Sequence, residues 1–272
     1  MKNPYNVAVL IPTRGRTDAL ERSVKSLVDL AKNLADLELV IGFDNDDNIG
    51  FPYFQQSLQP YLDKKKVTYT ILHFDSMGYA GLNRYYNRLA QEATADWLMV
   101  WNDDAIMGTK DWDSVIVKYT GQFKLLKIHV HREHPYSIFP IMPKDWFDLF
   151  GHLSRHQMTD AEVSQMAYMM DLMEIVEIHA IHDRHDLTGN NQDATYKNRE
   201  LLEGNPSNPK DFHHPAFQQA RLTDCDKIAT YLKSKNIDMS FWENVKLGKQ
   251  DPWIKMRAND INKQMNITPP PQ

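Results

Sequence analysis

Runs of apolar and β-branched residues alternate with polar segments through the first hundred residues of the chain. Four runs predict strands: residues 7–11, 37–43, 67–72 and 97–101. The first is a continuous apolar, β-branched run, as expected of a strand buried on both faces. The segments between them place apolar residues at helical spacing, which predicts helices over residues 18–31 and 82–93. Asp18 and Glu21 would cap the first of these helices. Alternating strands and helices predict parallel β-α-β units, and therefore a doubly wound α/β layer.

The second half of the chain has a less regular pattern. Short strands are expected at residues 128–130, 137–141 and 175–181, with a helix opened by Pro143. The polar, Gly- and Pro-containing stretch 187–215 predicts a loop. A helical pattern returns from residue 217, so we expect a helical C-terminal extension.

A further helix is expected where Thr159 and Glu162 fit the two ends of a capping box. The methionines behind this box recur at helical spacing: Met166, Met169, Met170 and Met173. Such a stripe indicates core packing rather than sulfur chemistry.

Composition places few limits on function. The chain has 272 residues, 42% hydrophobic and 25% charged, enough for one large α/β domain or two coupled halves. A net charge of −5 gives no overall attraction to phosphates or anionic membranes. The single cysteine, Cys225, excludes an intrachain disulfide and fits a reducing cytoplasm. The longest apolar runs are too short to cross a bilayer, so we expect a cytoplasmic protein with no membrane span.

An acidic cluster, Asn102-Asp103-Asp104, directly follows the run 97–101. Ligands of open α/β sheets bind at the carboxyl ends of strands. Carboxylates there can hold Mg²⁺ or Mn²⁺ together with a diphosphate. The simpler alternative is a polar turn that ends the strand.

A second acidic cluster, with Asp44, Asp46 and Asp47, follows the run 37–43. A carboxylate at this position can accept hydrogen bonds from a nucleobase or a ribose. An EF-hand is excluded because Ile49 and Gln55 occupy the positions of its glycine and its glutamate. A plain acidic turn is the alternative.

Taken in order, these motifs resemble those of family 2 glycosyltransferases of the GT-A fold. The resemblance rests on the run that ends in Pro12-Thr13-Arg14-Gly15-Arg16, on Asp44, on residues 81–87, and on residues 93–97 leading into 102–104. It implies a GT-A-like α/β fold, with a doubly wound, mostly parallel sheet and a helical C-terminal extension. It also implies an inverting enzyme that transfers a sugar from a nucleotide diphosphate donor, a UDP-sugar by default, with Mn²⁺ or Mg²⁺ as cofactor.

The resemblance assigns roles to single residues. Asp104 matches the last aspartate of the family's Asp-x-Asp motif and is the implied metal ligand. Asn102 stands where the family usually has aspartate: an asparagine can hydrogen-bond a ribose but brings no charge, so the resemblance implies weaker metal binding unless Asp103 compensates. Asn102 and Asp103 are counted with the nucleotide-sugar-binding residues. The remaining implied donor-site residues are Pro12, Thr13 and Arg14 around the nucleotide, Asp44 at the base, and Asn87 in the helix before the metal strand.

An inverting transfer also needs a carboxylate that takes the proton of the acceptor hydroxyl. In similar enzymes this residue begins a helix in the second half, and Asp160 fits that place. The helix N-terminus would favour its ionised form. Alternatively, Asp160 only satisfies amides of the first turn. Asp145 and Asp148 are weaker candidates for the base.

In some relatives a histidine beyond the last core strand completes the metal shell. His182 is best placed for this role and His185 is second. A zinc site is not expected, because His179 and His182 would point to opposite faces of a strand. A surface histidine is the plain alternative. Lys197 or Arg199 could reach a diphosphate if the preceding loop folds over the site.

We expect residues 1–105 to form the nucleotide-sugar-binding half, 106–212 the acceptor-binding half of the same domain, and 213–272 the helical extension. The acceptor stays open: a glycan, a protein or a modified nucleobase of phage-type DNA. A nucleobase acceptor would need a basic surface, for which the candidates are Arg132, Lys144, Arg155 and Arg184.

Two rival functions stay open at this point. A nucleotidyltransferase would need a glycine-rich phosphate loop after the first strand, where this chain has only Gly15. A catalytically inactive nucleotide-binding or scaffold protein is suggested by Asn102 at a position where a charged ligand is usual.

Overall fold

The computed structural model describes residues 6–131, 134–189, 197 and 212–261. Its centre is one sheet of eight strands. In spatial order these are β3 (Thr68–Phe74), β2 (Leu37–Asp44), β1 (Val7–Thr13), β4 (Trp97–Val100), β7 (Ile141–Pro143), β6 (Leu125–Val130), β8 (Met173–His182) and β5 (Ala105–Met107).

Most strands of this sheet run in one direction. Strands β1 to β4 pair in parallel, and so do β6 and β8. Strand β7 is antiparallel to both β4 and β6, so β6 and β8 point the same way as β4. The carboxyl ends of β1, β2, β4 and β8 therefore lie along one edge. The predicted mostly parallel sheet is confirmed.

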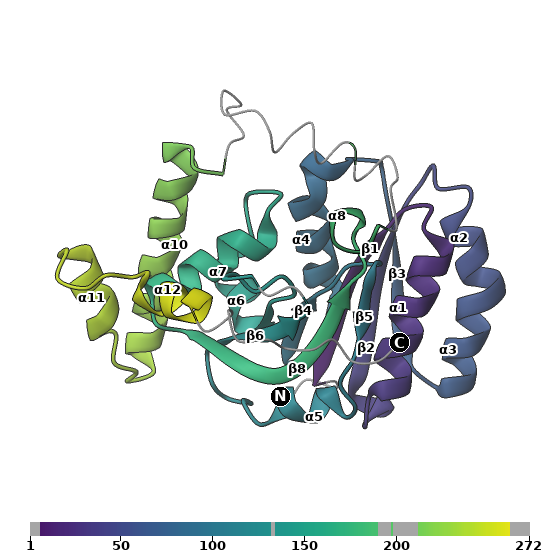
Figure 1. Cartoon of the computed structure of the whole chain (residues 1–272), viewed down its shortest axis with the longest axis horizontal. Coiled ribbons are helices and arrows are strands. Elements are labelled where there is room, and N and C mark those ends of the chain that lie inside the picture. The colour runs from purple at the N-terminus through teal and green to yellow at the C-terminus, as the bar shows by residue number, and fades with distance from the viewer. Residues whose placement is uncertain (1–5, 132–133, 190–196, 198–211, 262–272) are drawn as a thin grey trace.

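Helices cover both faces of the sheet (Figure 1). Alternation along β1 explains this: Val9 and Ile11 pack with Leu20 and Val24 of α1 (Thr17–Leu30), whereas Leu10 packs with the other face. The first face also carries α2 (Gly50–Tyr53), a π-helical turn (Phe54–Leu58), α3 (Gln59–Lys65) and α5 (Trp112–Val117). The second face carries α4 (Leu82–Glu92), α6 (Lys144–Phe150) and α7 (Thr159–Met169). The short elements are two 3-10 turns, Leu34–Asp36 and Tyr79–Gly81, and α8 (His185–Thr188).

The predicted helical extension is confirmed, and it packs on the main core. Helix α10 (Pro215–Ser234) contributes Cys225, Ile228 and Leu232 to the same apolar cluster as α6 and α7. Helices α11 (Ser240–Lys246) and α12 (Ile254–Ile261) follow, and Trp242 of α11 is buried in that cluster. Figure 1 shows these helices at the end of the molecule opposite α1 to α3. Within the described ranges, no helix is long and apolar enough to cross a membrane.

Two local expectations were wrong, and one strand was missed. Helix α1 begins at Thr17 with Arg16 as its N-cap, so Asp18 lies in the first turn instead of capping it. Ser137, Phe139 and Pro140 are buried without forming a strand, and the paired segment is β7. Strand β5 was not expected, because three residues carry too little periodicity to be recognised. The methionine stripe is buried as predicted, although α7 ends at Met169 and Met173 already belongs to β8.

Candidate active site

Asp104 and His182 face each other at the carboxyl edge of the sheet. Strand β5 starts directly after Asp104 and pairs with β8 in a register that places Ala105 opposite His182. The His182 Nε2 atom lies 3.4 Å from Asp104 Oδ1, and each residue is only 5% exposed. The backbone carbonyl of Asp104 also accepts a 2.8 Å hydrogen bond from the Asp183 amide. The paired strands therefore fix both side chains in position.

The Oδ1 atom of Asp104 is buried and has no hydrogen-bond partner. An unsatisfied buried carboxylate oxygen is costly, so such an atom calls for a cation or a donor. In the part of the chain that the structure describes, no three His, Cys, Asp or Glu side chains converge on a point that could hold a metal. Mg²⁺ and related hard cations, however, commonly take one or two protein ligands and complete their shell with water and substrate phosphates. Asp104 and His182 fit a metal of this kind.

Arg16 neutralises the acidic cluster from the loop after β1. Its Nη1 atom donates to Asp103 Oδ1 at 2.9 Å and to Asp104 Oδ2 at 3.1 Å. Thr13 donates its hydroxyl to Asp103 Oδ2 at 2.8 Å. Burial raises the pKa of Asp103, and the charge of Asp104 adds to the rise. Burial acts the same way on Asp104, but His182 and Arg16 outweigh it and hold its pKa below the usual value. The partners of Asp104 thus favour its ionised form, whereas burial opposes ionisation of Asp103.

Asn102 connects His182 to Tyr86 of α4. Its Oδ1 atom accepts a 2.7 Å hydrogen bond from the Tyr86 hydroxyl, which also lies 3.0 Å from the Trp101 carbonyl. Its Nδ2 atom lies 3.2 Å from His182 Nε2. The Nε2 atom therefore stands between the Asn102 amide and the Asp104 carboxylate, and a metal bound at Nε2 would replace the contact with Asn102, because an unprotonated ring nitrogen has a single lone pair. The asparagine thus orients the histidine.

Asp160 belongs to the same electrostatic environment. Tyr86 is buried, and burial is the largest cause of its raised pKa; the charges of Asp103, Asp160 and Asp104 raise it further. The three carboxylates therefore lie within electrostatic range of one buried tyrosine. Asp160 is half-buried in the first turn of α7.

Asn87 holds the loop that leads to α7. Its Oδ1 atom accepts from the amides of Leu153 at 2.7 Å and Ser154 at 3.3 Å, and its Nδ2 atom donates to the Ser154 carbonyl at 2.9 Å. The side-chain amide of Asn87, predicted to lie in the donor site, thus hydrogen-bonds this loop. In the structure its clearest role is to support the backbone that precedes Asp160.

The expected capping box of α7 does not form. Met158 is the N-cap, and Glu162 accepts from the amides of Arg155 and His156 instead. Burial raises the pKa of Glu162, and these two amides oppose the rise. Glu162 therefore stabilises the same loop as Asn87, from the other side.

The second acidic cluster forms a separate group near the ends of β1 and β2. Asp44 is 4% exposed and accepts a 2.6 Å hydrogen bond from Arg14, which also binds both carboxylate oxygens of Asp46. The Tyr85 hydroxyl donates to Asp44, and burial together with this contact raises the pKa of Tyr85 to about 12. Pro12, the residue before Thr13 in β1, lies opposite Gly42 of β2. The predicted nucleotide-binding residues are thus placed along one edge.

Asp47 has a structural role in this group. It accepts hydrogen bonds from the amides of Gly15 at 2.9 Å and Gly50 at 2.8 Å. Gly15 has a φ of +66°, a conformation that favours glycine. This clamp ties the loop after β1 to the loop after β2, and so positions Arg14 and Arg16.

Other candidates lie elsewhere or outside the described residues. Asp145 lines a cavity of about 490 Å³ with Asp96 and Trp97, at the opposite end of β4. Lys144 is paired with Asp148, and Arg155 with Asp224. Lys197 is exposed. The residues that lie outside the described part are Arg132, Arg199 and the side chain of His185.

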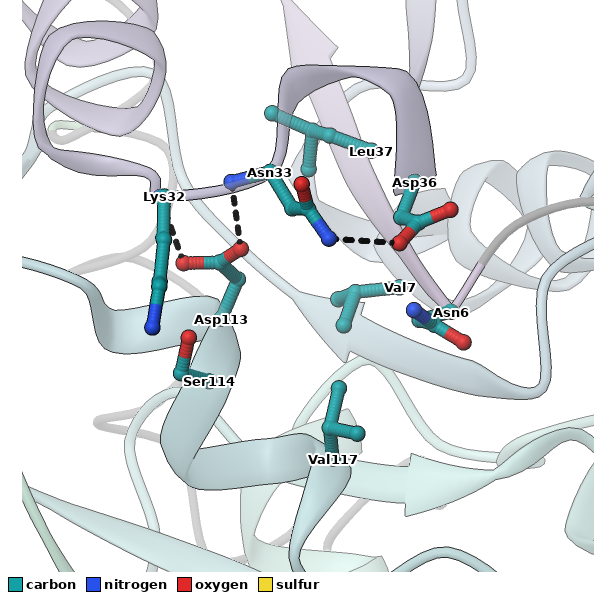
Figure 2. A pocket seen from close by; sticks show the side chains of 9 residues that line it. All are labelled: Asn6, Val7, Lys32, Asn33, Asp36, Leu37, Asp113, Ser114 and Val117. Atoms are coloured by element: carbon teal, nitrogen blue, oxygen red, sulfur yellow. Dashed lines mark hydrogen bonds between the residues drawn. The ribbon is translucent and has the colours of Figure 1, made fainter.

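A smaller cavity of about 180 Å³ lies at the amino end of β1 and β2 (Figure 2). Asp113 lines this cavity, and its carboxylate oxygens accept hydrogen bonds from the backbone amides of Lys32 at 2.8 Å and Asn33 at 2.9 Å. These contacts hold the end of α1 against α5. The cavity is remote from the acidic clusters, and we assign it no part in the site.

Three residues of the site were not singled out from the sequence: Arg16, Tyr85 and Tyr86. Arg16 lies in the motif after the first strand, but its contacts with Asp103 and Asp104 join residues far apart in the sequence, so the sequence pattern does not predict them. The tyrosines lie next to Asn87 on α4, and aromatic residues on a helix usually indicate core packing. The available signal was that both tyrosines carry a hydroxyl and belong to the first half of a helix that leads to the predicted metal strand.

No protein-family model matches the chain, and no curated protein matches its sequence. Solved structures match its fold. S. aureus TarS 1–349 in complex with UDP-GlcNAc gives a TM-score of 0.59 at 10% identity, over 96% of this chain and 76% of that chain. The mannosyltransferase PcManGT from Pyrobaculum calidifontis, in complex with GDP-Man and Mn²⁺, gives 0.55 at 12% identity, over 96% and 87%.

The chain has a GT-A-like fold. The fold expected from the sequence is confirmed. Because the sequence identities are only 10% and 12%, these similarities show the fold alone. Another structure of S. aureus TarS matches at a TM-score of 0.50. The match covers 64% of this chain and 36% of the TarS chain.

Proposed function

We propose that this protein is a metal-dependent glycosyltransferase that moves a sugar from a nucleotide diphosphate sugar to an acceptor hydroxyl, with inversion. The observation that carries the proposal is the buried Oδ1 atom of Asp104, which has no hydrogen bond and lies 3.4 Å from His182 Nε2, with Asp160 in electrostatic range of the same cluster. The order of motifs that resembles family 2 glycosyltransferases supports it. So does the fold shared with a mannosyltransferase in complex with GDP-Man and Mn²⁺.

The donor would lie across the carboxyl ends of β1, β2 and β4, within residues 1–105. Asp44 would accept a hydrogen bond from the base, since a carboxylate offers about four acceptor sites and Arg14 and Tyr85 use two. Pro12 and Thr13 would border the nucleotide. UDP is the first donor nucleotide to test, because of the family resemblance and because one structure of the same fold contains UDP-GlcNAc.

Asp104 and His182 would hold Mn²⁺ or Mg²⁺. When bound, the metal would neutralise charge on the leaving diphosphate. Asn102 would hold the ring of His182 in place beside Asp104 until the metal replaces the Asn102 amide at Nε2. The neutral Asn102 reduces the charge of the motif, and Asp103 restores a second carboxylate that Arg16 and Thr13 hold in place.

Asp160 would take the proton from the acceptor hydroxyl as that oxygen attacks the anomeric carbon. Its place at the start of α7 favours the ionised form. Asn87 and Glu162 would fix its position through the loop 151–158. The acceptor would approach from residues 106–212. The chemistry of the site selects a hydroxyl, and the acceptor molecule itself is open.

The direct test is donor turnover without an acceptor, in which water replaces the acceptor hydroxyl. Purified protein is incubated with UDP-, GDP- and dTDP-sugars, each with Mn²⁺ or with a chelator, and the released nucleoside diphosphate is measured. The proposal predicts release from one nucleotide class, dependent on metal and abolished in Asp104→Asn. Equal release from wild type and Asp104→Asn, or none with any donor while a folded wild type also fails to bind them, would refute it.

A further inference from the structure

Arg16 places a positive charge where the proposed metal would bind. A single Nη1 atom contacts both Asp103 and Asp104, at 2.9 and 3.1 Å. The Arg16 side chain is only 15% exposed, so the interaction is weakly screened by solvent. Arg16 is also the N-cap of α1, and the Gly15–Asp47 clamp fixes the backbone beside it. The fold therefore holds the guanidinium of Arg16 in place within the acidic cluster.

The two oxygens of Asp104 have different partners. Oδ2 accepts from Arg16, whereas Oδ1 has no hydrogen bond and lies 3.4 Å from the Nε2 atom of His182. A divalent cation at Oδ1 would share one carboxylate with the guanidinium. Two cations at such short range repel each other strongly in a buried site. The metal alone should therefore bind weakly, even though its ligands are in place.

A diphosphate removes this conflict. It brings negative charge that both cations can contact, and a guanidinium is well suited to phosphate oxygens because its N–H groups form a planar fork. The distribution of charge points to Arg16 for this role. Arg14 binds Asp44 and Asp46, and Arg22 binds Asp183, with side chains 42% and 52% exposed.

We propose that Arg16 couples the two ligands of the site: it opposes metal binding in the absence of donor, and it binds the diphosphate of the donor together with the metal. Metal and nucleoside diphosphate then bind with positive cooperativity that depends on this one side chain. The inference rests on the proposed function and adds to it the order in which the site fills. A site of this kind stays free of metal until the donor arrives.

The test measures Mn²⁺ affinity rather than turnover. Mn²⁺ is titrated into wild type, Arg16→Gln and Arg88→Gln, without nucleotide and with saturating UDP or GDP, by calorimetry or by electron paramagnetic resonance of free Mn²⁺. Arg88→Gln is the matched control: it loses the same charge on the exposed side of α4, where Arg88 is 55% exposed and lies near Glu92.

In wild type and Arg88→Gln, the nucleotide should tighten Mn²⁺ binding at least about tenfold, within the usual range of coupling between sites. In Arg16→Gln, Mn²⁺ alone should bind at least about fivefold more tightly than in wild type, and the effect of nucleotide should fall to about twofold or less. Arg16→Lys keeps the charge, so Mn²⁺ alone should bind as weakly as in wild type. This second variant keeps the test valid if Arg16→Gln does not fold.

The outcomes separate the two proposals. Wild type that binds neither UDP nor GDP with Mn²⁺ overturns the proposed function and this inference together. Wild type that binds nucleotide and metal, with the same coupling in Arg16→Gln, overturns the inference alone. Mn²⁺ that binds Arg16→Lys as tightly as expected for Arg16→Gln also overturns it, because the charge would then have no effect.

Discussion

The Nε2 atom of His182 lies 3.4 Å from the Oδ1 atom of Asp104, and the pairing of β5 with β8 sets this distance. Asp104 ends the turn after β4, and the three residues of β5 return along β8 to bring the end of that strand beside it. The metal-binding potential of the site thus depends on a backbone register. Two side chains from opposite halves of the chain could not otherwise be held so closely.

Replacing His182 with alanine should weaken Mn²⁺ binding, in the presence of nucleotide, by at least about 10–100-fold, the range seen when even indirect supports of a metal are removed. Calorimetric titration measures this directly. His179→Ala is the matched control, since His179 lies on the same strand with its side chain 51% exposed. Equal Mn²⁺ affinity in the two variants would remove His182 from the metal site.

Replacing Asp160 with asparagine should lower turnover about 10²–10⁴-fold, because a general base contributes that much, while donor affinity stays within about twofold. Initial rates over a range of donor concentrations separate the two effects. Asp148→Asn is the control, since Asp148 is 59% exposed and pairs with Lys144 on α6. A variant of Asp160 with wild-type turnover, or a loss shared with Asp148→Asn, would exclude Asp160 as the base.

Replacing Asp44 with asparagine should weaken nucleotide binding about tenfold or more, because a hydrogen bond to a charged group contributes about 1.5–3 kcal/mol. Asp46→Asn should have a much smaller effect, since Asp46 is 61% exposed and exposed ion pairs contribute little. Fluorescence or calorimetric titration with the nucleoside diphosphate compares the two. Equal losses of nucleotide affinity in the two variants would show that the nucleobase does not bind at Asp44.

Asp224 should couple stability to acid pH. It is fully buried and accepts hydrogen bonds from Arg155 and His152. Burial tends to raise the pKa of Asp224, but these two partners lower it below its usual value of 3.8. A lowered folded pKa adds stability that is present above the unfolded pKa and is lost as the pH falls through the folded pKa.

Asp224→Asn should therefore reduce the free energy of unfolding at pH 7 by about 2–3 kcal/mol, and its difference from wild type should shrink below pH 4. Urea unfolding over a pH series measures both effects. The exposed Asp251→Asn should change stability by at most about 0.5 kcal/mol. A difference between Asp224→Asn and wild type that stayed constant down to pH 3 would contradict the lowered pKa.

The parallel half of the fold could be predicted because its strands are continuous apolar runs that end in polar residues. Parallel strands share a carboxyl edge, so chain order alone brings Thr13, Asp44 and Asp104 to one side of the sheet. That reasoning places residues on an edge. It gives neither the partner of each side chain nor the contact of Arg16 with Asp103 and Asp104, which depends on the Gly15–Asp47 clamp.

The second half was less predictable for a physical reason. An apolar run indicates burial rather than strand pairing. Ser137, Phe139 and Pro140 are buried, yet they do not form a strand. Strand β5 is only three residues long, yet it fixes the position of His182. The role of Glu162 was also hidden, because its position fits a capping box, whereas folding directs its carboxylate to the preceding loop.

The most direct measurement is the thermal unfolding of wild type and Asp104→Asn with UDP, GDP, dTDP and CDP, each with and without Mn²⁺. A ligand that binds only the folded state raises the melting temperature by mass action. We expect one nucleotide to stabilise wild type, in the presence of Mn²⁺ only, and Asp104→Asn to lose that metal-dependent rise. No stabilisation of folded wild type by any nucleotide, or an equal rise in Asp104→Asn, would contradict a metal-dependent donor site at Asp104.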